Sequence, residues 1–167
     1  DTSLDGLHSS HTELMIKITD LRSGKRFKNH IKGDVGFDIE CWCPNANEQA
    51  IPPHSFKKLL SGIQIKVGDN CWGAIRPRSS THFKRNLIVM EGTIDSGYTG
   101  DLYINVYNPT NDYQYVRNGD SLAQLIPIPK FNKVDIKVVE NFPETERGNR
   151  GFGSTGGLPI DTYMSED

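Results

Sequence analysis

The chain has 167 residues with a formal net charge of -2, and 35% of its residues are hydrophobic and 24% charged. These values predict one soluble domain with a single core. They exclude the basic excess that is typical of nucleic-acid-binding surfaces, and no apolar run approaches the ~20 residues that a helix needs to cross a bilayer, so we expect neither nucleic acid nor a membrane as a partner.

Residues 1–12 lack the charged start and apolar stretch of a signal peptide and are expected to form a flexible leader. The cysteines, Cys41, Cys43 and Cys71, are too few for a disulfide framework, although they leave room for one bridge. Their spacing is not that of zinc ligands. We therefore expect an intracellular protein, cytoplasmic or nuclear and not secreted. The basic residues at 22–32 are expected to form a solvated loop.

Alternating apolar and polar residues predict β-strands, each with one buried and one wet face. The apolar positions expected to face the core are Leu14, Ile16 and Ile18, then Ile63, Ile65 and Val67, then Leu102, Ile104 and Val106, and finally Val134, Ile136 and Val138. Turn signals such as Gly68-Asp69-Asn70 and Asn118-Gly119-Asp120 separate the runs. Many short strands with frequent turns predict an all-β sandwich or closed barrel.

One short helix is expected over 81–85, capped by Ser79 or Ser80. We expect the barrel domain to span residues 13–140, followed by an arm at 141–157 and a tail at 158–167.

Two polar stretches interrupt the strand pattern. Asp38 lies between two apolar residues, and an acidic group there needs either a salt bridge to an arginine or a place near a magnesium-bound phosphate. Pro77 ends strand pairing, and Arg78 with two serines follows, as either a plain capping turn or a phosphate site. The residues alone leave both pairs of interpretations open.

Three later stretches carry similar alternatives. Residues 91–108 predict a hairpin with its turn at Ser96-Gly97, where Asp95 is either a turn former or a functional carboxylate. Gln124 is either an outward side chain or a hydrogen bonder of a site. The glycine-rich segment 146–157 is either a disordered tail or a segment that is mobile until it binds a nucleotide.

In this order, the motifs V-G-F-D-I, P-R-S-S, G-T-I-D-S-G-Y-T-G, G-D-S-L-A-Q-L and R-G-N-R-G-F-G-S-T-G resemble the five motifs of the trimeric dUTP pyrophosphatases (dUTPases). Each motif alone is weak, but all five in order and with fitting spacings are strong evidence. The resemblance covers about 35–156, which is most of the chain.

The resemblance implies a distorted jelly-roll β-barrel with a flexible glycine-rich C-terminal arm, assembled as a homotrimer. Each active site would draw on three chains. One chain would supply Asp38, residues 78–80 and Gln124, a second the hairpin around Asp95, and the third the C-terminal arm. The arm would then act as a lid that becomes ordered when it closes over a nucleotide.

The implied reaction is the hydrolysis of dUTP to dUMP and pyrophosphate with Mg²⁺, which keeps uracil out of DNA and supplies dUMP for dTMP synthesis. Asp95 would activate the attacking water, with Arg78 and Gln124 as further catalytic residues. Asp38 would contact the metal indirectly, through water. The substrate-binding residues implied by the resemblance are Arg78, Ser79, Ser80, Val89, Thr93, Ile94, Asp95, Tyr98, Tyr103, Gln124, Arg147, Phe152, Gly153, Ser154 and Thr155.

The resemblance implies that each group of these residues would contact a different part of the nucleotide. Tyr98 would stack under the deoxyribose and exclude a 2′-hydroxyl, while backbone near Val89 and Tyr103 would pair with the uracil edge. Residues 78–80 would bind phosphate oxygens, with Ser79 stabilising charge on the leaving oxygen. Gln124 would contact the α-phosphate region. Among the arm residues, Arg147, Ser154 and Thr155 would hold the β- and γ-phosphates, and Phe152 would cover the uracil.

Some positions depart from the commonest pattern of the family. Val35 stands where alanine is usual, Gly97 where many members carry an acidic residue, and Asn149 and Arg150 replace an acidic residue and a small one. None of these positions has been assigned to the chemistry.

The sequence leaves two other functions to distinguish. A dCTP deaminase shares the fold and several motifs, but that family needs a glutamate where this chain has Asn105. A dUTPase-fold protein that acts through protein contacts would offer 22–32 and 158–167 as surfaces.

Overall fold

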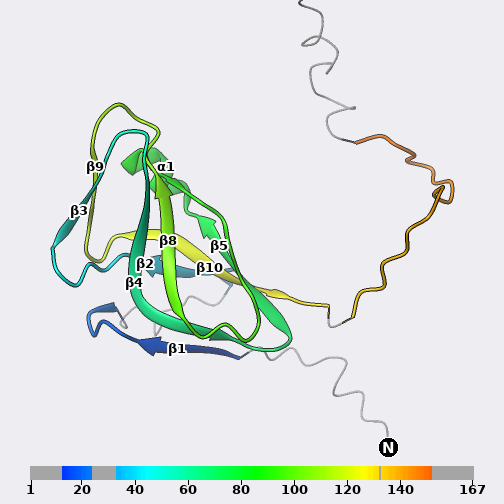
Figure 1. The fold of residues 1–167 in the computed structure, drawn as a ribbon, viewed down its shortest axis with the longest axis horizontal. Coiled ribbons are helices and arrows are strands. Elements are labelled where there is room, and N and C mark those ends of the chain that lie inside the picture. The colour runs from blue at the N-terminus through cyan, green and yellow to red at the C-terminus, as the bar shows by residue number, and fades with distance from the viewer. Residues whose placement is uncertain (1–12, 24–32, 132, 152–167) are drawn as a thin grey trace, which may run out of the picture. The chain divides into compact units, whose positions relative to one another are not determined.

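The structure is a computed structural model that describes residues 13–23, 33–131 and 133–151. The strands and the helix, in chain order, are β1 (Leu14–Ile18), β2 (Phe37–Glu40), β3 (Glu48–Ile51), β4 (Phe56–Val67), β5 (Cys71–Pro77), α1 (Ser79–Arg85), β6 (Ile88–Val89), β7 (Gly92–Ile94), β8 (Asp101–Tyr107), β9 (Gln114–Arg117) and β10 (Ser121–Pro129). Figure 1 shows these elements along the chain. The chain divides into two compact units, one ending at Asn132 and the other beginning at Lys133.

Antiparallel strands of the first unit form two four-stranded sheets and a ribbon. The first sheet has the order β1-β4-β8-β6, and the second sheet has the order β2-β10-β5-β7. The ribbon pairs β3 with β9. Because sequential strands repeatedly pass from one sheet to the other, this arrangement is of the jelly-roll kind. It confirms the all-β prediction.

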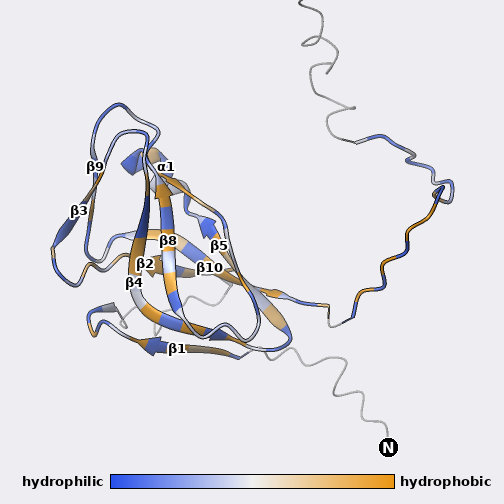
Figure 2. Ribbon diagram, in the orientation of Figure 1, coloured by the Kyte–Doolittle hydropathy of each residue, from blue (hydrophilic) through white to orange (hydrophobic). Residues whose placement is uncertain are grey.

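The core of the first unit includes most of the apolar side chains that the alternation predicted there, together with others that it did not. On β4, Ile63 and Ile65 are each 2% exposed, while Lys66 between Ile65 and Val67 faces water. On β8, Ile104 and Val106 are fully buried. β1 follows its prediction less closely, because Ile18 at its end is 43% exposed. Figure 2 shows apolar segments along both central strands.

The helix and the hairpin differ from their predictions. The helix begins at Ser79 and not at Thr81, and Arg78 takes the N-cap position without a side-chain cap bond. The stretch 91–108 forms no simple hairpin: β7 pairs with β5, and β8 pairs with β4 and β6. Burial of Ile94 in the core favours pairing with the second sheet, so this tertiary contact overrides the local hairpin pattern.

The predicted strand at 134–138 is wrong for this single chain. No strand is assigned within residues 133–151, and Val134, Ile136 and Val138 are 66%, 86% and 98% exposed. An alternating segment becomes a strand only when a sheet edge supplies the hydrogen bonds and a surface covers its apolar face. The described part of this chain supplies neither for this segment.

The three cysteines form no disulfide. Burial raises the pKa of the Cys41 thiol to about 12, and its Sγ donates to the Arg117 carbonyl at 3.2 Å. This thiol is therefore protonated and unreactive at neutral pH. Within the described ranges, no helix is both long and apolar enough to span a bilayer.

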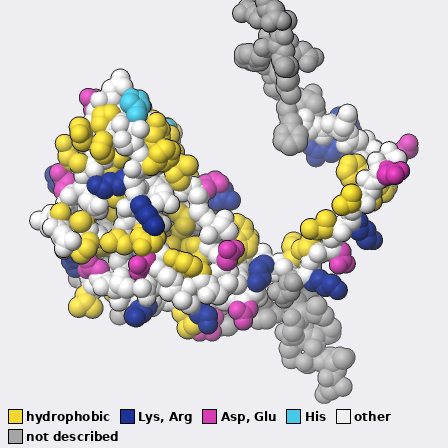
Figure 3. All heavy atoms as spheres, in the orientation of Figure 1, with side chains coloured by type: hydrophobic (Ala, Val, Ile, Leu, Met, Phe, Trp, Pro, Cys, Tyr) yellow, Lys and Arg dark blue, Asp and Glu magenta, His cyan; other side chains and the backbone are white. Residues whose placement is uncertain are grey.

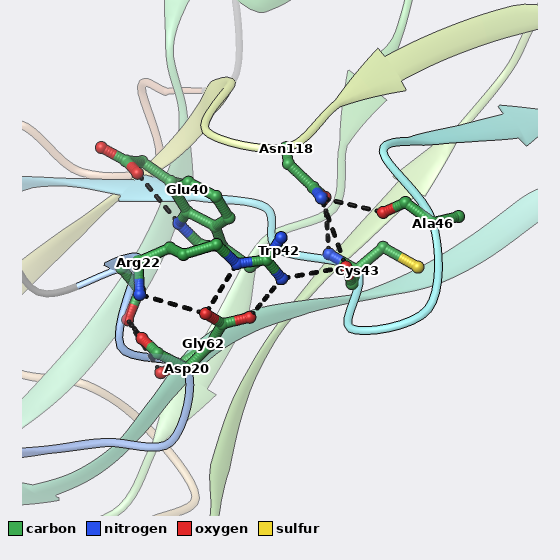
Figure 4. Close-up of polar contacts among 9 residues, drawn as sticks. Asp20, Arg22, Glu40, Trp42, Cys43, Ala46, Gly62 and Asn118 are labelled. Carbon is green, nitrogen blue, oxygen red and sulfur yellow. Dashed lines mark hydrogen bonds and ion pairs between the residues drawn. The ribbon is translucent and has the colours of Figure 1, made fainter.

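The first residue of the basic segment, Arg22, is held by a polar cluster that Figure 4 shows. Its guanidinium lies 4.9 Å from the centre of the Trp42 ring and donates to Asp20 at 2.9 Å. That hydrogen bond lowers the pKa of the Asp20 carboxyl. Trp42 in turn donates to Glu40 at 2.9 Å. Arg22 is thus fixed to the barrel, whereas residues 24–32 of the predicted loop lie outside the described ranges.

Candidate active site

Three polar residues of separate motifs meet on one side of the second sheet. Gln124 of β10 is the register partner of Asp38 on β2, so both side chains stand on the same face. Arg78, just after β5, forms an ion pair from Nε to Asp38 Oδ1 at 3.0 Å and donates to the Ser121 carbonyl at 3.0 Å. Gln124 donates to the Pro77 carbonyl at 3.2 Å. We call Asp38, Arg78 and Gln124 the acid–arginine cluster.

The ion pair confirms the salt-bridge interpretation of Asp38. Both side chains remain partly exposed, 40% for Asp38 and 32% for Arg78, so the pair contributes at most about 1 kcal/mol to stability. Its effect is geometric, because it fixes the plane of the guanidinium while other N–H groups can still reach a ligand. The metal interpretation of Asp38 remains compatible with this arrangement.

Glycine at position 36 lets the neighbouring strand approach Gln124 closely. A Cβ atom at Gly36 would lie 3.0 Å from Gln124 Oε1 and 2.9 Å from Ile126 Cγ1. Contacts this short would displace the Gln124 side chain. The glycine of the V-G-F-D-I motif therefore has a packing role that composition alone does not reveal.

The first turn of α1 presents both serines beside Arg78. Ser79 is exposed and Ser80 is half-buried. The helix is fixed from below by Thr81, whose hydroxyl donates to the Leu122 carbonyl at 2.6 Å. Arg85 at its other end pairs with Asp120 at 2.8 Å. The helix is thus bonded both to the turn before β10, at Asp120, and to the start of β10, at Leu122.

The loop after β7 presents Asp95 and Tyr98 to solvent. A turn links the Asp95 carbonyl to the Tyr98 N–H at 3.2 Å, with Gly97 at φ +88. A positive φ favours glycine, which explains why Gly97 is accepted here. The Tyr98 hydroxyl donates to the Asp101 carbonyl at 2.7 Å, and its ring lies so close to Gly100 that a Cβ there would clash. Tyr98 is 42% exposed.

The predicted uracil-binding strands separate beside Val89 and Tyr103. Pairing between β6 and β8 ends with the bond from Met90 N to the Asn105 carbonyl at 2.8 Å. Among the described residues, no strand therefore pairs with this edge of β8 from 101 to 104. Such an edge offers backbone donors and acceptors to a ligand.

The other predicted residues of this region lie nearby, each in a defined place. Val89 is buried, and Thr93 and Ile94 pair with β5 at Ala74 and Gly73. Tyr103 is half-buried, and its hydroxyl lies 3.4 Å from Asp101 Oδ2. Partial burial and the Asp101 carboxylate raise the pKa of the Tyr103 phenol.

One chain does not bring Asp95 to the acid–arginine cluster. Ile94 pairs with Gly73 near the start of β5, whereas Arg78 follows the end of the same strand. Five residues of extended chain separate these points, roughly 16 Å at about 3.3 Å per residue. Within one chain, the Asp95 loop and Arg78 therefore lie at opposite ends of β5.

The arm is described only up to residue 151. Arg147 and Arg150 form reciprocal side-chain-to-backbone hydrogen bonds. Arg147 Nε donates to the Arg150 carbonyl at 2.6 Å, and Arg150 Nε donates to the Arg147 carbonyl at 2.9 Å. The four remaining predicted arm residues, which are Phe152, Gly153, Ser154 and Thr155, lie outside the described residues.

Sequence reasoning missed two polar contacts of this region. Arg76, on the same row as Gln124, pairs with Glu91 at 2.7 Å. Ser96, next to Asp95, accepts from Lys130 at 3.0 Å. The lysine is 34 residues away, so no local spacing could have identified the second contact.

The comparisons with known proteins agree with the five motifs. The dUTPase family model matches residues 22–156. The chain is 35% identical over 125 residues to the deoxyuridine 5′-triphosphate nucleotidohydrolase of Paramecium bursaria Chlorella virus 1, which covers 75% of this chain and 85% of the relative.

Solved structures of the same kind are similar in fold. The dUTPase of Staphylococcus bacteriophage 80alpha with dUpNHpp matches with a TM-score of 0.72 and 25% identity, over 87% of this chain and 99% of the other. The D95N dUTPase of Staphylococcus aureus phage phi11, described with a structural Mg(II) ion, matches with a TM-score of 0.65 over 79% of this chain and 99% of the other. Because the two chains are only 23% identical, this match shows similarity of fold alone.

Proposed function

Because this chain belongs to the dUTPase family, we propose that it hydrolyses dUTP to dUMP and pyrophosphate. The family match spans the whole region from β2 to the glycine-rich arm. The observation that carries the proposal is the acid–arginine cluster, where three separate motifs converge on one exposed face. Hydrolysis of dUTP keeps uracil out of DNA and supplies dUMP for dTMP synthesis.

In the proposed reaction, Asp95 accepts a proton from the water that attacks the α-phosphorus. A bond forms between the water oxygen and phosphorus, and the bond from phosphorus to the bridging oxygen breaks, releasing pyrophosphate. Asp95 is exposed on a turn that its own carbonyl closes, so its carboxylate projects from fixed backbone. Proton acceptance by a positioned carboxylate is worth roughly 10²–10⁴-fold in rate.

The phosphate chain would lie over the acid–arginine cluster and the first turn of α1. Arg78 binds phosphate oxygens through the guanidinium that Asp38 orients. Ser79 and Ser80 donate their hydroxyls, with Ser79 stabilising charge on the leaving oxygen. Gln124 contacts the α-phosphate region. The arm adds Arg147, which would hold the terminal phosphates.

The nucleoside would be read by the loop and strands beyond Asp95. Tyr98 stacks under the deoxyribose with the exposed side of its ring, which leaves no room for a 2′-hydroxyl. The open edge of β8 at Tyr103, together with backbone near Val89, pairs with the uracil edge as a second strand would. A tight fit against this edge disfavours the 5-methyl group of thymine.

We infer that Mg²⁺ accompanies the substrate. The described residues contain no group of three or more acidic, histidine or cysteine side chains that could hold a metal by themselves. Mg²⁺ commonly binds through phosphates and one carboxylate while keeping several waters, and Asp38 fits that single carboxylate, acting through water. When bound, the ion neutralises charge on the phosphate oxygens.

We further propose that the active protein is a homotrimer with shared sites. The roughly 16 Å of strand between the Asp95 loop and Arg78 supports a site to which different chains supply these residues. Two apolar surfaces are also available. The outer face of the first sheet carries Phe56, 68% exposed, against Tyr107, and Figure 3 shows hydrophobic side chains gathered over β4 and β8. The segment 134–138 is the other surface.

The double change Ile136→Lys and Val138→Lys is expected to break the trimer. Light scattering of the wild-type protein should give about 56 kDa, three times the chain mass of 18.7 kDa. The variant should give a smaller mass and lose dUTP turnover, because two charges in an apolar interface must be desolvated. Leu21→Lys, which changes a side chain already 91% exposed, is the matched control. An intact, active trimer in the double variant would contradict a buried role for this segment.

Pyrophosphate release with Mg²⁺ tests the proposed function directly. We expect turnover of dUTP and much slower turnover of dCTP, dTTP and UTP. Ammonia release from dCTP would instead identify a deaminase, against the expectation from Asn105. A protein that turns over none of these nucleotides would refute the enzyme function and direct attention to protein partners.

The state of the cysteines indicates a location for the protein. All three cysteines are free, which agrees with a reducing compartment, and we propose an intracellular site, cytoplasmic or nuclear.

A further inference from the structure

Three segments that are distant in sequence meet beside Asp95. β5 begins at Cys71, β10 ends at Pro129, and these two residues are register partners. The turn that follows β7 places Ser96 against the same point, where its hydroxyl donates to the Cys71 carbonyl at 2.5 Å. Lys130 follows β10 directly and donates from Nζ to the Ser96 hydroxyl at 3.0 Å.

These contacts use Ser96 as both acceptor and donor. Its oxygen receives a bond from a charged ammonium group and passes its own proton to a carbonyl, and consecutive hydrogen bonds of this kind strengthen one another. Lys130 is itself anchored, because its backbone N–H donates to the Asn70 carbonyl at 3.0 Å. The result is a chain of bonds from the end of β10 to the start of β5, with the residue after Asp95 in its middle.

We propose that Ser96 and Lys130 are positioning residues for Asp95. This inference rests on the proposed function, since it assigns them the task of holding the carboxylate that activates water. The loop is held separately at its two ends: Ser96 is bonded to Cys71 and Lys130, while the Tyr98 hydroxyl is bonded to the Asp101 carbonyl at 2.7 Å. Loss of the first contact therefore shifts Asp95 more than Tyr98.

This separation predicts a change in kcat with little change in nucleotide binding. A small displacement of a reacting group can lower the rate by up to about 100-fold. Lys130→Ala removes only one of several restraints, and we expect kcat to fall by about tenfold while KM stays within about twofold. The dissociation constant of the non-hydrolysable analogue dUpNHpp, measured by calorimetry, should also stay within about twofold.

Matched variants separate this role from a general effect of charge or stability. Lys130→Arg keeps a donor and should recover most of the lost kcat. Ser96→Ala should lower kcat to a similar extent, and the double variant should be no worse than the lower single variant, because both belong to one chain of bonds. Lys133→Ala, which removes an exposed positive charge three residues further along, should leave kcat unchanged.

The outcomes also distinguish this inference from the proposed function. Wild-type protein without dUTP turnover would overturn the proposed function and this inference with it. Wild-type turnover with an unchanged kcat in Lys130→Ala would overturn the inference alone. So would a weaker affinity of that variant for dUpNHpp that accounts for its loss of rate, because Lys130 would then act on the substrate.

Discussion

Changing Asp95 to asparagine is expected to lower kcat for dUTP by roughly 10²- to 10⁴-fold, the range measured for loss of a general base. The amide is nearly isosteric with the carboxylate but cannot accept the proton of the attacking water. Asparagine also suits turns as well as aspartate does, so the bond from Tyr98 N to the residue-95 carbonyl should survive. The change therefore tests chemistry rather than folding.

The measurement is pyrophosphate release under saturating dUTP, with dUpNHpp affinity and melting temperature as companions. The variant should bind the analogue with an affinity close to that of the wild type. Asp112→Asn, the same chemical change at an exposed turn residue, is the control and should retain full activity. Retention of turnover within about tenfold of wild type would show that Asp95 is not the base, because general-base catalysis contributes more than that.

The fold was largely predictable because two long strands carry their pattern without ambiguity. Ile63 and Ile65 on β4, and Ile104 and Val106 on β8, alternate with polar residues and are buried as expected. Period-two alternation reports burial on one face, which is the property that a sheet packed on a core imposes. What alternation does not report is the partner strand. For this reason the local pattern predicts a hairpin between β7 and β8, whereas β7 pairs with β5 in the structure.

The segment 134–138 illustrates the limit of the same reasoning. Its alternation is as regular as that of β8, yet the three valine and isoleucine side chains are exposed. The pattern specifies a face to be covered but not which molecule covers it. If a neighbouring chain supplies the sheet edge, the sequence pattern and the single-chain structure are both accounted for.

Three residues of the candidate site were singled out from the sequence, and the structure shows how they lie relative to one another. Asp38, Arg78 and Gln124 lie in three different motifs, and only the register of β2 with β10 and of β10 with β5 places them together. The salt bridge to Arg78 is one of the two alternatives for Asp38, and the place beside a magnesium-bound phosphate stays a prediction. Local sequence could not decide this, since both partners come from distant segments.

The arm of one chain is expected to complete a site that contains Asp95 of another. Ending the chain after Glu146 removes Arg147, Phe152, Ser154 and Thr155. Hydrogen bonds to charged groups contribute roughly 1.5–3 kcal/mol each and base stacking about 1–3 kcal/mol, so losing one contact of each kind should lower kcat/KM by at least about 70-fold. Steady-state kinetics with dUTP measure this loss, and a trimeric mass by light scattering would show that assembly is preserved.

Mixed trimers decide whether the arm crosses between chains. The truncated chain keeps Asp95 but lacks the arm, and full-length Asp95→Asn keeps the arm but lacks the base, so each alone should be nearly inactive. Co-expressed with different tags and purified on both, they form sites that combine the Asp95 of one chain with the arm of the other. Purification on both tags leaves only trimers that contain both kinds of chain, and in each of these about one site in three receives both intact parts, so activity should rise to roughly a third of wild type. If each arm instead served the Asp95 of its own chain, no mixed site would be complete and the mixture would remain as inactive as its components. The roughly 16 Å of β5 between the Asp95 loop and Arg78 supports a site that is shared between chains, and recovered activity would assign the arm to a chain other than the one that supplies Asp95.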